Sequence, residues 1–375
     1  EAVKTYRGEE EFEERVRQAG RELRDVEVEL ARHRAKLLPT VNFGIAVVLM
    51  AILGVGGKMA LSGTLSVGTL VAYYFYVSRS LGPVRQAPNI VFGWYKAKAA
   101  MDRIEAVLES RDELEEADEP EPLPAGDLTV AFDDVHFSYS DRETGERFEA
   151  VRGIGFELGP SDRVVILGPS GSGKSTTGKL IPRLFDPDRG EVTANGVSLK
   201  QLDLEEWRGR VGYIGQEVSL FHGTIRDNIA FGVDEPDERE LARAVRVAAV
   251  DEIADEKADG LDALVGEKGG KLSGGQRKRV AMARALLRDP DILVVDQFAA
   301  DIEQRLCRRV FEAIGEECDV SILYVGHRVP AGLDDRRVYW MEHGELEERT
   351  GDFAAEAQRR GGKTAAEKKQ RLKTD

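Results

Sequence analysis

The segment Gly168-Pro169-Ser170-Gly171-Ser172-Gly173-Lys174-Ser175 decides the fold of this 375-residue chain. It matches the pattern GxxxxGK[ST], follows the apolar run Val164–Leu167 and precedes a stretch of helical character. Glycines in such a loop let backbone N–H groups surround phosphate oxygens, and the helix start adds the positive end of its dipole. The lysine of the pattern reaches the outer phosphates, and its last hydroxyl binds Mg²⁺. The segment therefore predicts a nucleotide site, with ATP and Mg²⁺ as ligands.

A second apolar run supports the same site. Ile292–Asp296 reads as a strand that ends in a carboxylate, which is the partner needed to hold Mg²⁺ beside the phosphates. From about Gly126 onward, short β-rich runs alternate with helical stretches, and this alternation predicts a parallel sheet covered by helices. We expect an α/β domain of the P-loop NTPase class at residues 126–356.

Leu272-Ser273-Gly274-Gly275-Gln276 lies between these two segments and is followed by the basic run 277–279. It resembles the signature motif of ABC ATP-binding cassettes. Other segments, in the expected order, resemble ABC transporters of the exporter type, and the resemblance covers nearly the whole chain, from residue 3 to about 356. It implies a cassette with a RecA-like core and a helical subdomain, preceded by an all-α membrane segment.

The resemblance also implies roles for individual residues. Tyr139 would stack on adenine, Gln216 would approach Mg²⁺ and the attacking water, and His327 would contact the γ-phosphate. Val265–Gly270 resembles the X-loop of exporters, which would contact the coupling helices of the membrane domain. The expected nucleotide-binding residues are Tyr139, Gly168, Pro169, Ser170, Gly171, Ser172, Gly173, Lys174, Ser175, Thr176, Ser273, Gly274, Gly275 and Gln276, and the expected metal ligands are Ser175, Gln216 and Asp296.

The signature motif of this family serves the nucleotide of a second cassette, because two cassettes close head to tail on two ATP molecules. A dimer with a second half-transporter is therefore implied. The catalytic residues expected in the chain's own site are Gln216, Gln297 and His327.

Gln297 departs from the family pattern, which has a glutamate after the Asp296 position to act as general base. An amide cannot take the proton of the attacking water, and general-base help is worth about 10² to 10⁴ in rate. The following run Phe298–Glu303 is also unusual, with Glu303 at a position where the family has aspartate. A Glu-to-Gln change made to trap ATP would alter one residue only, so we favour a degenerate subunit of a heterodimer.

The N-terminal part is expected to enter the membrane. Residues 1–36 form a charged helical stretch, and 37–61 and 68–94 are apolar enough for two spans. Basic residues flank the outer ends of both, which places these ends and the cassette in the cytosol at the cytoplasmic membrane. Arg79 and Arg85 either line a translocation path or, as we favour, snorkel toward the cytosolic side. We expect a membrane part at 1–108, a proline-rich linker at 109–125 and a polar tail at 357–375.

Composition limits the remaining function classes. The net charge of −15 argues against a nucleic-acid partner, and it fits either a salt-adapted or an ordinary acidic surface. Cys307 and Cys318 suggest neither a disulfide framework nor a metal site. Because exporters of this type carry about six membrane helices before the cassette, we expect this chain to be a fragment. A regulatory or soluble-type ABC ATPase is the alternative function, and the transported substrate cannot be read from the sequence.

Overall fold

The computed structural model describes residues 4, 9–108, 114, 116–117, 119–140, 145–333 and 336–349. These residues divide into two compact units, Glu1–Arg111 and Asp112–Asp375. The predicted polar tail at 357–375 and part of the predicted linker lie outside the described residues.

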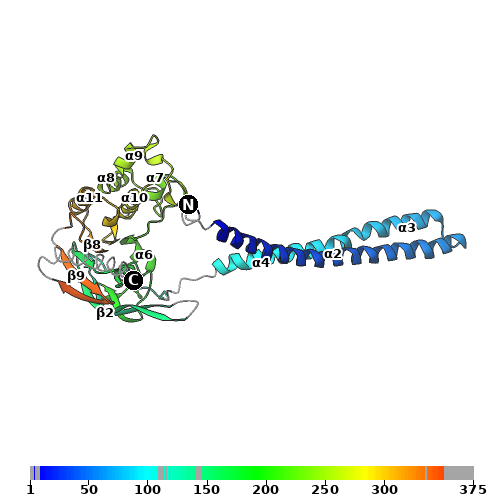
Figure 1. Cartoon of the computed structure of the whole chain (residues 1–375), viewed down its shortest axis with the longest axis horizontal. Coiled ribbons are helices and arrows are strands. Elements are labelled where there is room, and N and C mark those ends of the chain that lie inside the picture. Colours follow the sequence, from blue (N-terminus) through cyan, green and yellow to red (C-terminus); the bar gives the residue numbers. More distant parts are fainter. Residues whose placement is uncertain are drawn as a thin grey trace. The chain divides into compact units, whose positions relative to one another are not determined.

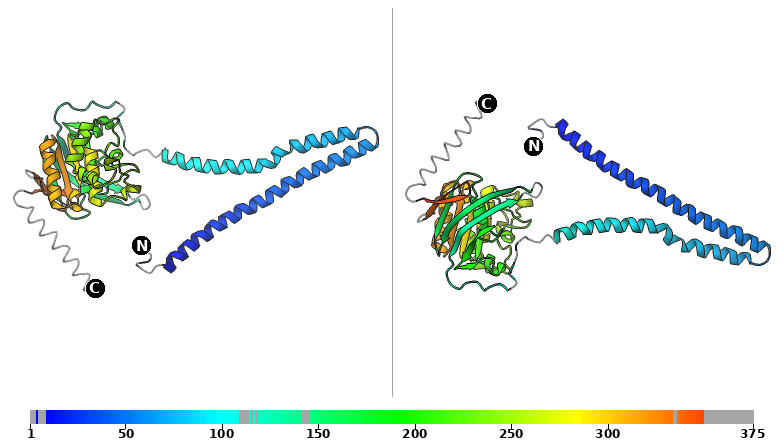
Figure 2. Two further views of the ribbon diagram at one scale, coloured as in Figure 1. Left: turned by 90° about the horizontal axis from the view of Figure 1, so that it is seen from above. Right: turned by 90° about the horizontal axis from the view of Figure 1, so that it is seen from below.

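The described residues of the N-terminal unit form the helices α2 (Glu9–Leu61), α3 (Val67–Ser80) and α4 (Gly82–Leu108). The charged stretch and the first apolar segment form one continuous helix, α2, which runs alongside α3 and diverges from α4 toward the ends of the hairpin (Figure 2). Gly56 allows α2 and α3 to approach closely, because a Cβ at this position would lie 2.3 Å from Cδ1 of Leu70.

Pro39–Leu61 is the part of α2 that is suited to a bilayer. It has 23 residues with a mean hydropathy of 2.0, and only 11% of its most apolar window is buried within the protein. At 1.5 Å per residue it extends about 35 Å, which exceeds the roughly 30 Å of hydrocarbon in a bilayer. Several of its large apolar side chains, including Phe43 and Met50, are exposed and would be costly to leave in water.

The second apolar segment differs from the expectation. Residues 68–94 do not form one helix, since α3 ends with Leu81 as its C-cap and α4 begins at Gly82. Pro83 fits the start of α4, because proline is favoured in the first turn of a helix, although Pro39 and Pro88 lie inside α2 and α4. Among the described helices, only the one containing Pro39–Leu61 has the length and composition of a span.

The C-terminal unit is built around a six-stranded sheet in the order β10-β9-β3-β8-β7-β6. The neighbours from β9 to β6 are parallel, and β10 pairs antiparallel with β9. Its strands are β3 (Arg163–Leu167), β6 (Val211–Ile214), β7 (Ile292–Asp296), β8 (Ser321–Gly326), β9 (Arg337–Glu342) and β10 (Glu345–Arg349).

A second, four-stranded antiparallel sheet has the order β2-β1-β4-β5. It consists of β1 (Val130–Ser140), β2 (Arg147–Leu158), β4 (Arg189–Ala194) and β5 (Val197–Ser198). The helices of the unit are α5 (Lys174–Leu180), α6 (Leu204–Gly209), α7 (Ile225–Ile229), α8 (Glu238–Val247), α9 (Asp251–Asp255), α10 (Gly274–Leu286) and α11 (Gln304–Glu317).

Strand β3 separates two hydrophobic cores. Val165 and Leu167 pack into the core with helices α7, α8 and α10, whereas Val164 and Ile166 pack into the core with the antiparallel sheet. Figure 1 shows these helices gathered at one end of the unit and strands β2 and β9 at the other. A strand buried on both faces is typical of parallel sheets covered on both sides, and the predicted α/β fold is confirmed.

Candidate nucleotide site

Four parallel strands deliver the predicted site residues to one edge of the sheet. β3 leads into the loop at 168–173, β6 precedes Gln216, β7 ends at Asp296, and β8 precedes His327. The register aligns these ends, since Leu167 pairs with Gly326 and Asp296 pairs with Val325. Ligands of open parallel sheets bind at this carboxyl edge, so the topology brings the predicted residues together.

The glycines of the loop are required by space and by backbone conformation. Gly173 has φ +103°, and a Cβ there would lie 2.1 Å from the carbonyl oxygen of Ala150. At Gly168 a Cβ would lie 2.0 Å from the carbonyl oxygen of Met341. The loop is therefore pressed against strands β2 and β9 at these two positions, which leave no room for a side chain.

Lys174 is the first residue of α5, and its side chain is buried. Its Nζ donates hydrogen bonds to the Pro169 carbonyl at 2.6 Å and to Ser172 Oγ at 3.3 Å. Burial lowers the pKa of Lys174 to about 8, although the charge of Asp296 acts in the opposite direction. The ammonium thus lies beside the loop, where an anionic phosphate would replace part of its lost solvation.

Asp296 and Ser175 have the chemistry of a magnesium site. Asp296 is 2% exposed, and burial raises the pKa of its carboxyl, while the Ser175 hydroxyl donates a hydrogen bond to it. Its other oxygen, Oδ1, is buried and has no hydrogen-bond partner among the described residues. Because Mg²⁺ prefers hard oxygen ligands and keeps open positions for phosphates, this hydroxyl and carboxylate pair fits the ion.

The described residues contain no cluster of three or more His, Cys, Asp or Glu side chains that could hold a metal without other ligands. A cation held by Asp296 and Ser175 could complete its coordination with oxygens of phosphate and water.

Gln216 and Gln297 contact each other at the same edge. Nε2 of Gln297 donates to Oε1 of Gln216 at 3.1 Å. Gln297 adopts a left-handed backbone with φ +53°, which is unusual for a residue other than glycine. The backbone N–H of Gln297 donates to the Val325 carbonyl at 2.8 Å, which fixes the residue directly after β7.

His327 is oriented by the phosphate-binding loop. Its Nδ1 lies 3.0 Å from the carbonyl oxygen of Gly168. Because a carbonyl can only accept, Nδ1 carries the proton in this contact and Nε2 remains an acceptor when the ring is neutral.

Most of these residues line one cavity of about 310 Å³, which reaches the size range of small-molecule sites, whereas the predicted site residues Gly168, Pro169 and Asp296 are not in its lining. Tyr139 lies on its wall, where its hydroxyl contacts Thr176 Oγ1 at 3.2 Å and its ring packs edge-on against Phe137 and Phe185. Phe148 and Ala150, which the sequence analysis did not identify, also line it. The complete lining is Tyr139, Phe148, Ala150, Ser170, Gly171, Ser172, Gly173, Lys174, Ser175, Thr176, Gln216, Gln297 and His327.

The signature segment is not part of this lining. Ser273 caps α10, with its Oγ accepting from the Gln276 N–H at 3.2 Å and Gln276 Oε1 accepting from the Ser273 N–H at 2.9 Å. This reciprocal capping box fixes the start of α10. The predicted X-loop likewise lies elsewhere, where Val265 donates its N–H to the Gly223 carbonyl.

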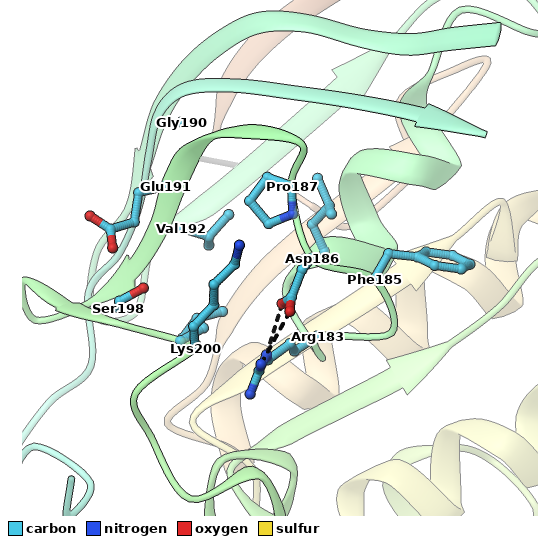
Figure 3. A pocket seen from close by; sticks show the side chains of 11 residues that line it. Arg183, Phe185, Asp186, Pro187, Gly190, Glu191, Val192, Ser198 and Lys200 are labelled. Carbon is cyan, nitrogen blue, oxygen red and sulfur yellow. Dashed lines mark hydrogen bonds and ion pairs between the residues drawn. The ribbon is translucent and has the colours of Figure 1, made fainter. Parts of the chain in front are cut away.

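A second cavity is lined in part by residues of β4 and β5. Its volume is about 100 Å³, too small for a nucleotide. Figure 3 shows Arg183 and Asp186 facing each other at its edge, where Arg183 Nε donates to Asp186 Oδ1 at 2.8 Å. Asp186 thus neutralises the buried guanidinium of Arg183, as a buried charge requires.

Comparisons with known proteins agree with this geometry. The family model described as ABC transporter matches residues 151–300. An uncharacterized ABC transporter ATP-binding protein of Bacillus subtilis is 33% identical over 83% of this chain and 53% of its own length. An ATP-dependent lipid A-core flippase of Chromobacterium violaceum is 30% identical over 92% of this chain and 59% of its own length.

Among solved structures, a bacterial Atm1-family ABC exporter with ATP bound is similar with a TM-score of 0.83 and 27% identity. This similarity covers 96% of the present chain and 64% of that one. The chain therefore spans little more than half the length of the curated relatives it matches.

Proposed function

The chain is an exporter-type ABC protein, and from this premise we propose that it is the ATP-binding, membrane-spanning subunit of an ABC exporter. In this proposal, ATP binding and hydrolysis in a dimer of cassettes drive export of a substrate across the cytoplasmic membrane. The alternative of a regulatory or soluble-type ATPase is less consistent with the exposed apolar segment Pro39–Leu61.

One observation carries the proposal. The cavity contains the phosphate loop, Gln216, Gln297 and His327, whereas the signature segment lies outside its lining. A complete site therefore needs the signature segment of a second cassette. Relatives named as ABC exporters support this arrangement of two halves.

The side chains of the cavity suggest a division of labour. Lys174 and the loop N–H groups would hold the phosphates, and Tyr139 would pack on the base. Asp296 and Ser175 would hold Mg²⁺, which when bound offsets the charge of the phosphates. His327 has only Nε2 left for the terminal phosphate, because its Nδ1 donates to Gly168, and Nε2 would have to carry a proton to donate to a phosphate oxygen.

Gln297 limits the chemistry of this site. Its amide lies beside Gln216 at the place where a general base would orient water, yet it has no lone pair basic enough to take a proton. We infer that the chain binds Mg²⁺ and ATP but hydrolyses ATP slowly in its own site. The intact signature segment could complete a competent site on a different partner, so we favour a heterodimer.

The membrane part of the proposal rests on α2, α3 and α4. Pro39–Leu61 would cross the bilayer, and α3 with the first part of α4 would return, interrupted at Leu81. This topology places the charged N-terminal part of α2 and the end of α4 on the cytosolic side with the cassette.

Steady-state ATP turnover and nucleotide binding of the full chain in lipid nanodiscs test the proposal. We expect the unchanged chain to bind a fluorescent ATP analogue with Mg²⁺ but to turn over slowly, and Gln297→Glu to raise turnover by about 10² to 10⁴. A Gln297→Asp variant is the matched control, because it supplies a carboxylate one methylene short. Rapid ATP turnover by the unchanged chain would contradict the proposal that its own site hydrolyses ATP slowly. Failure to bind nucleotide would contradict the proposal that the chain is an ATP-binding subunit.

A further inference from the structure

Lys278 is a buried cation that the proposed mechanism does not use. It lies in the second turn of α10, five residues after Ser273, and is 4% exposed. Its Nζ donates to the main-chain carbonyl of Gln297 at 2.7 Å and forms an ion pair with Asp301 Oδ2 at 2.8 Å. A buried ammonium is retained only where it is well paired, and both of its partners lie in the segment after β7.

The bond to Gln297 bears directly on the cavity. Gln297 has the left-handed backbone that only a well-supported non-glycine residue maintains. Its N–H is held by Val325, and its carbonyl accepts from Lys278 and, at 3.2 Å, from the Ala300 N–H. The side chain of Gln297, fixed by this backbone, reaches Gln216.

Asp301 connects the same ammonium to the start of α10. Its backbone carbonyl would lie 2.7 Å from a Cβ added at Gly275, and its side chain would lie 3.7 Å from a Cβ at Gly274. The segment that contains Gln297 and Asp301 is therefore held against the start of α10, through the close approach of Asp301 to the signature glycines and through the ammonium of Lys278.

We propose that Lys278 is a positioning residue that holds Gln297 in the cavity, and that Asp301 keeps the ammonium in place. The inference rests on the proposed function, because it assigns Gln297 to the nucleotide site. The bonds of Lys278 run to Gln297 and Asp301, and its charge also favours the ionised form of Asp296. Its bonded route to the cavity therefore passes through Gln297.

Arg279 offers a matched control on the same helix. It is also nearly buried, and its Nη1 donates to a backbone carbonyl, that of Ala249, at 2.7 Å and to the carboxylate of Glu252 at 3.1 Å. It differs from Lys278 in having no bond to the segment 296–301. If the removal of any buried cation from α10 were enough to loosen the segment 296–301, substitution of either residue would accelerate hydrogen exchange there equally.

Hydrogen exchange of the full chain in nanodiscs, without nucleotide, tests the proposal directly. We expect Lys278→Met to accelerate exchange in peptides covering 296–303 by about tenfold or more, since a hydrogen bond to a charged group is lost. Arg279→Met should leave that region within twofold of the unchanged chain and accelerate exchange near 249–252. Lys278→Arg should restore part of the protection.

The proposal is overturned if 296–303 exchanges equally in Lys278→Met and Arg279→Met, or if it exchanges as in the unchanged chain. In the Gln297→Glu background, Lys278→Met should lower kcat about tenfold with KM for ATP within twofold. The exchange experiment is done without nucleotide, so its result does not depend on ATP binding. A failure to bind ATP would contradict the proposed function, whereas unchanged exchange at 296–303 would contradict the role of Lys278.

Discussion

The phosphate loop and the signature segment use the same local structure for different purposes. Each is a glycine-rich entry into a helix, α5 or α10. Gly173, the N-cap of α5, provides no side-chain bond to its helix, and the loop lines the cavity. Ser273 caps α10 through a capping box, and its segment lines no part of that cavity. In the proposed function this difference has a use, because the signature segment at the start of α10 would complete the phosphate-loop site of a second cassette.

Removal of the lysine at the first entry should have the largest effect. We expect Lys174→Ala to weaken Mg²⁺–ATP binding by about 100-fold, because a charge-assisted contact to phosphate is lost. Ser273→Ala should leave the affinity of the isolated chain unchanged within twofold. Equilibrium binding of a fluorescent ATP analogue measures the affinity of both variants. An equal loss of affinity in the two would contradict the difference between the phosphate loop and the signature segment.

The pH dependence of binding sharpens the same contrast. Because the pKa of Lys174 is about 8 in the folded chain, the ammonium is lost above this pH. We expect ATP affinity to fall by up to about tenfold per pH unit above pH 8. Lys174→Arg should remove the pH dependence of ATP affinity, since a guanidinium stays charged. An ATP affinity that does not change with pH in the unchanged chain would contradict the role of Lys174 in phosphate binding.

The same residue affects folding with a defined sign. Its folded pKa lies below the unfolded value of 10.5, so the unfolded chain binds more protons between pH 8 and 10.5. The contribution of Lys174 to the free energy of unfolding therefore increases as pH rises through this window.

The smallest effect is expected at the second entry. Ser273→Ala removes the acceptor of the capping bond and should lower the free energy of unfolding by about 1 kcal/mol. Ser170→Ala, in the exposed part of the phosphate loop, should change it by less than about 0.5 kcal/mol. Equilibrium urea unfolding of the two variants measures the difference, and equal values would show that the capping box adds nothing.

The sequence predicted the phosphate-binding edge well because each element there is locally encoded. Apolar strands followed by Gly168, Asp296 or His327 can be recognised without knowledge of distant contacts. The match to ABC transporters confirmed the family, while the individual roles of these residues stay predictions.

Other features depend on contacts between distant residues and were not predicted. A side chain at position 173 would clash with the carbonyl oxygen of Ala150, which is distant in the sequence. The carbonyl of Gln297 accepts a hydrogen bond from Lys278 in α10. The unusual run after Gln297 also has a structural reason, since Phe298 is fully buried with its ring edge-on to Phe311. The division of residues 68–94 at Leu81 was missed because hydropathy alone does not show where one helix ends and the next begins.

The position of strand β3 between two cores affects how the cassette unfolds. Its four apolar residues, Val164 to Leu167, alternate between the helical core and the antiparallel core, and the phosphate loop follows its end. Neither core can melt without exposing one face of this strand, so the two subdomains are expected to unfold cooperatively rather than in sequence. Nucleotide bound at the end of β3 would then protect both subdomains at once, and a partly denatured cassette with one intact core should be rare.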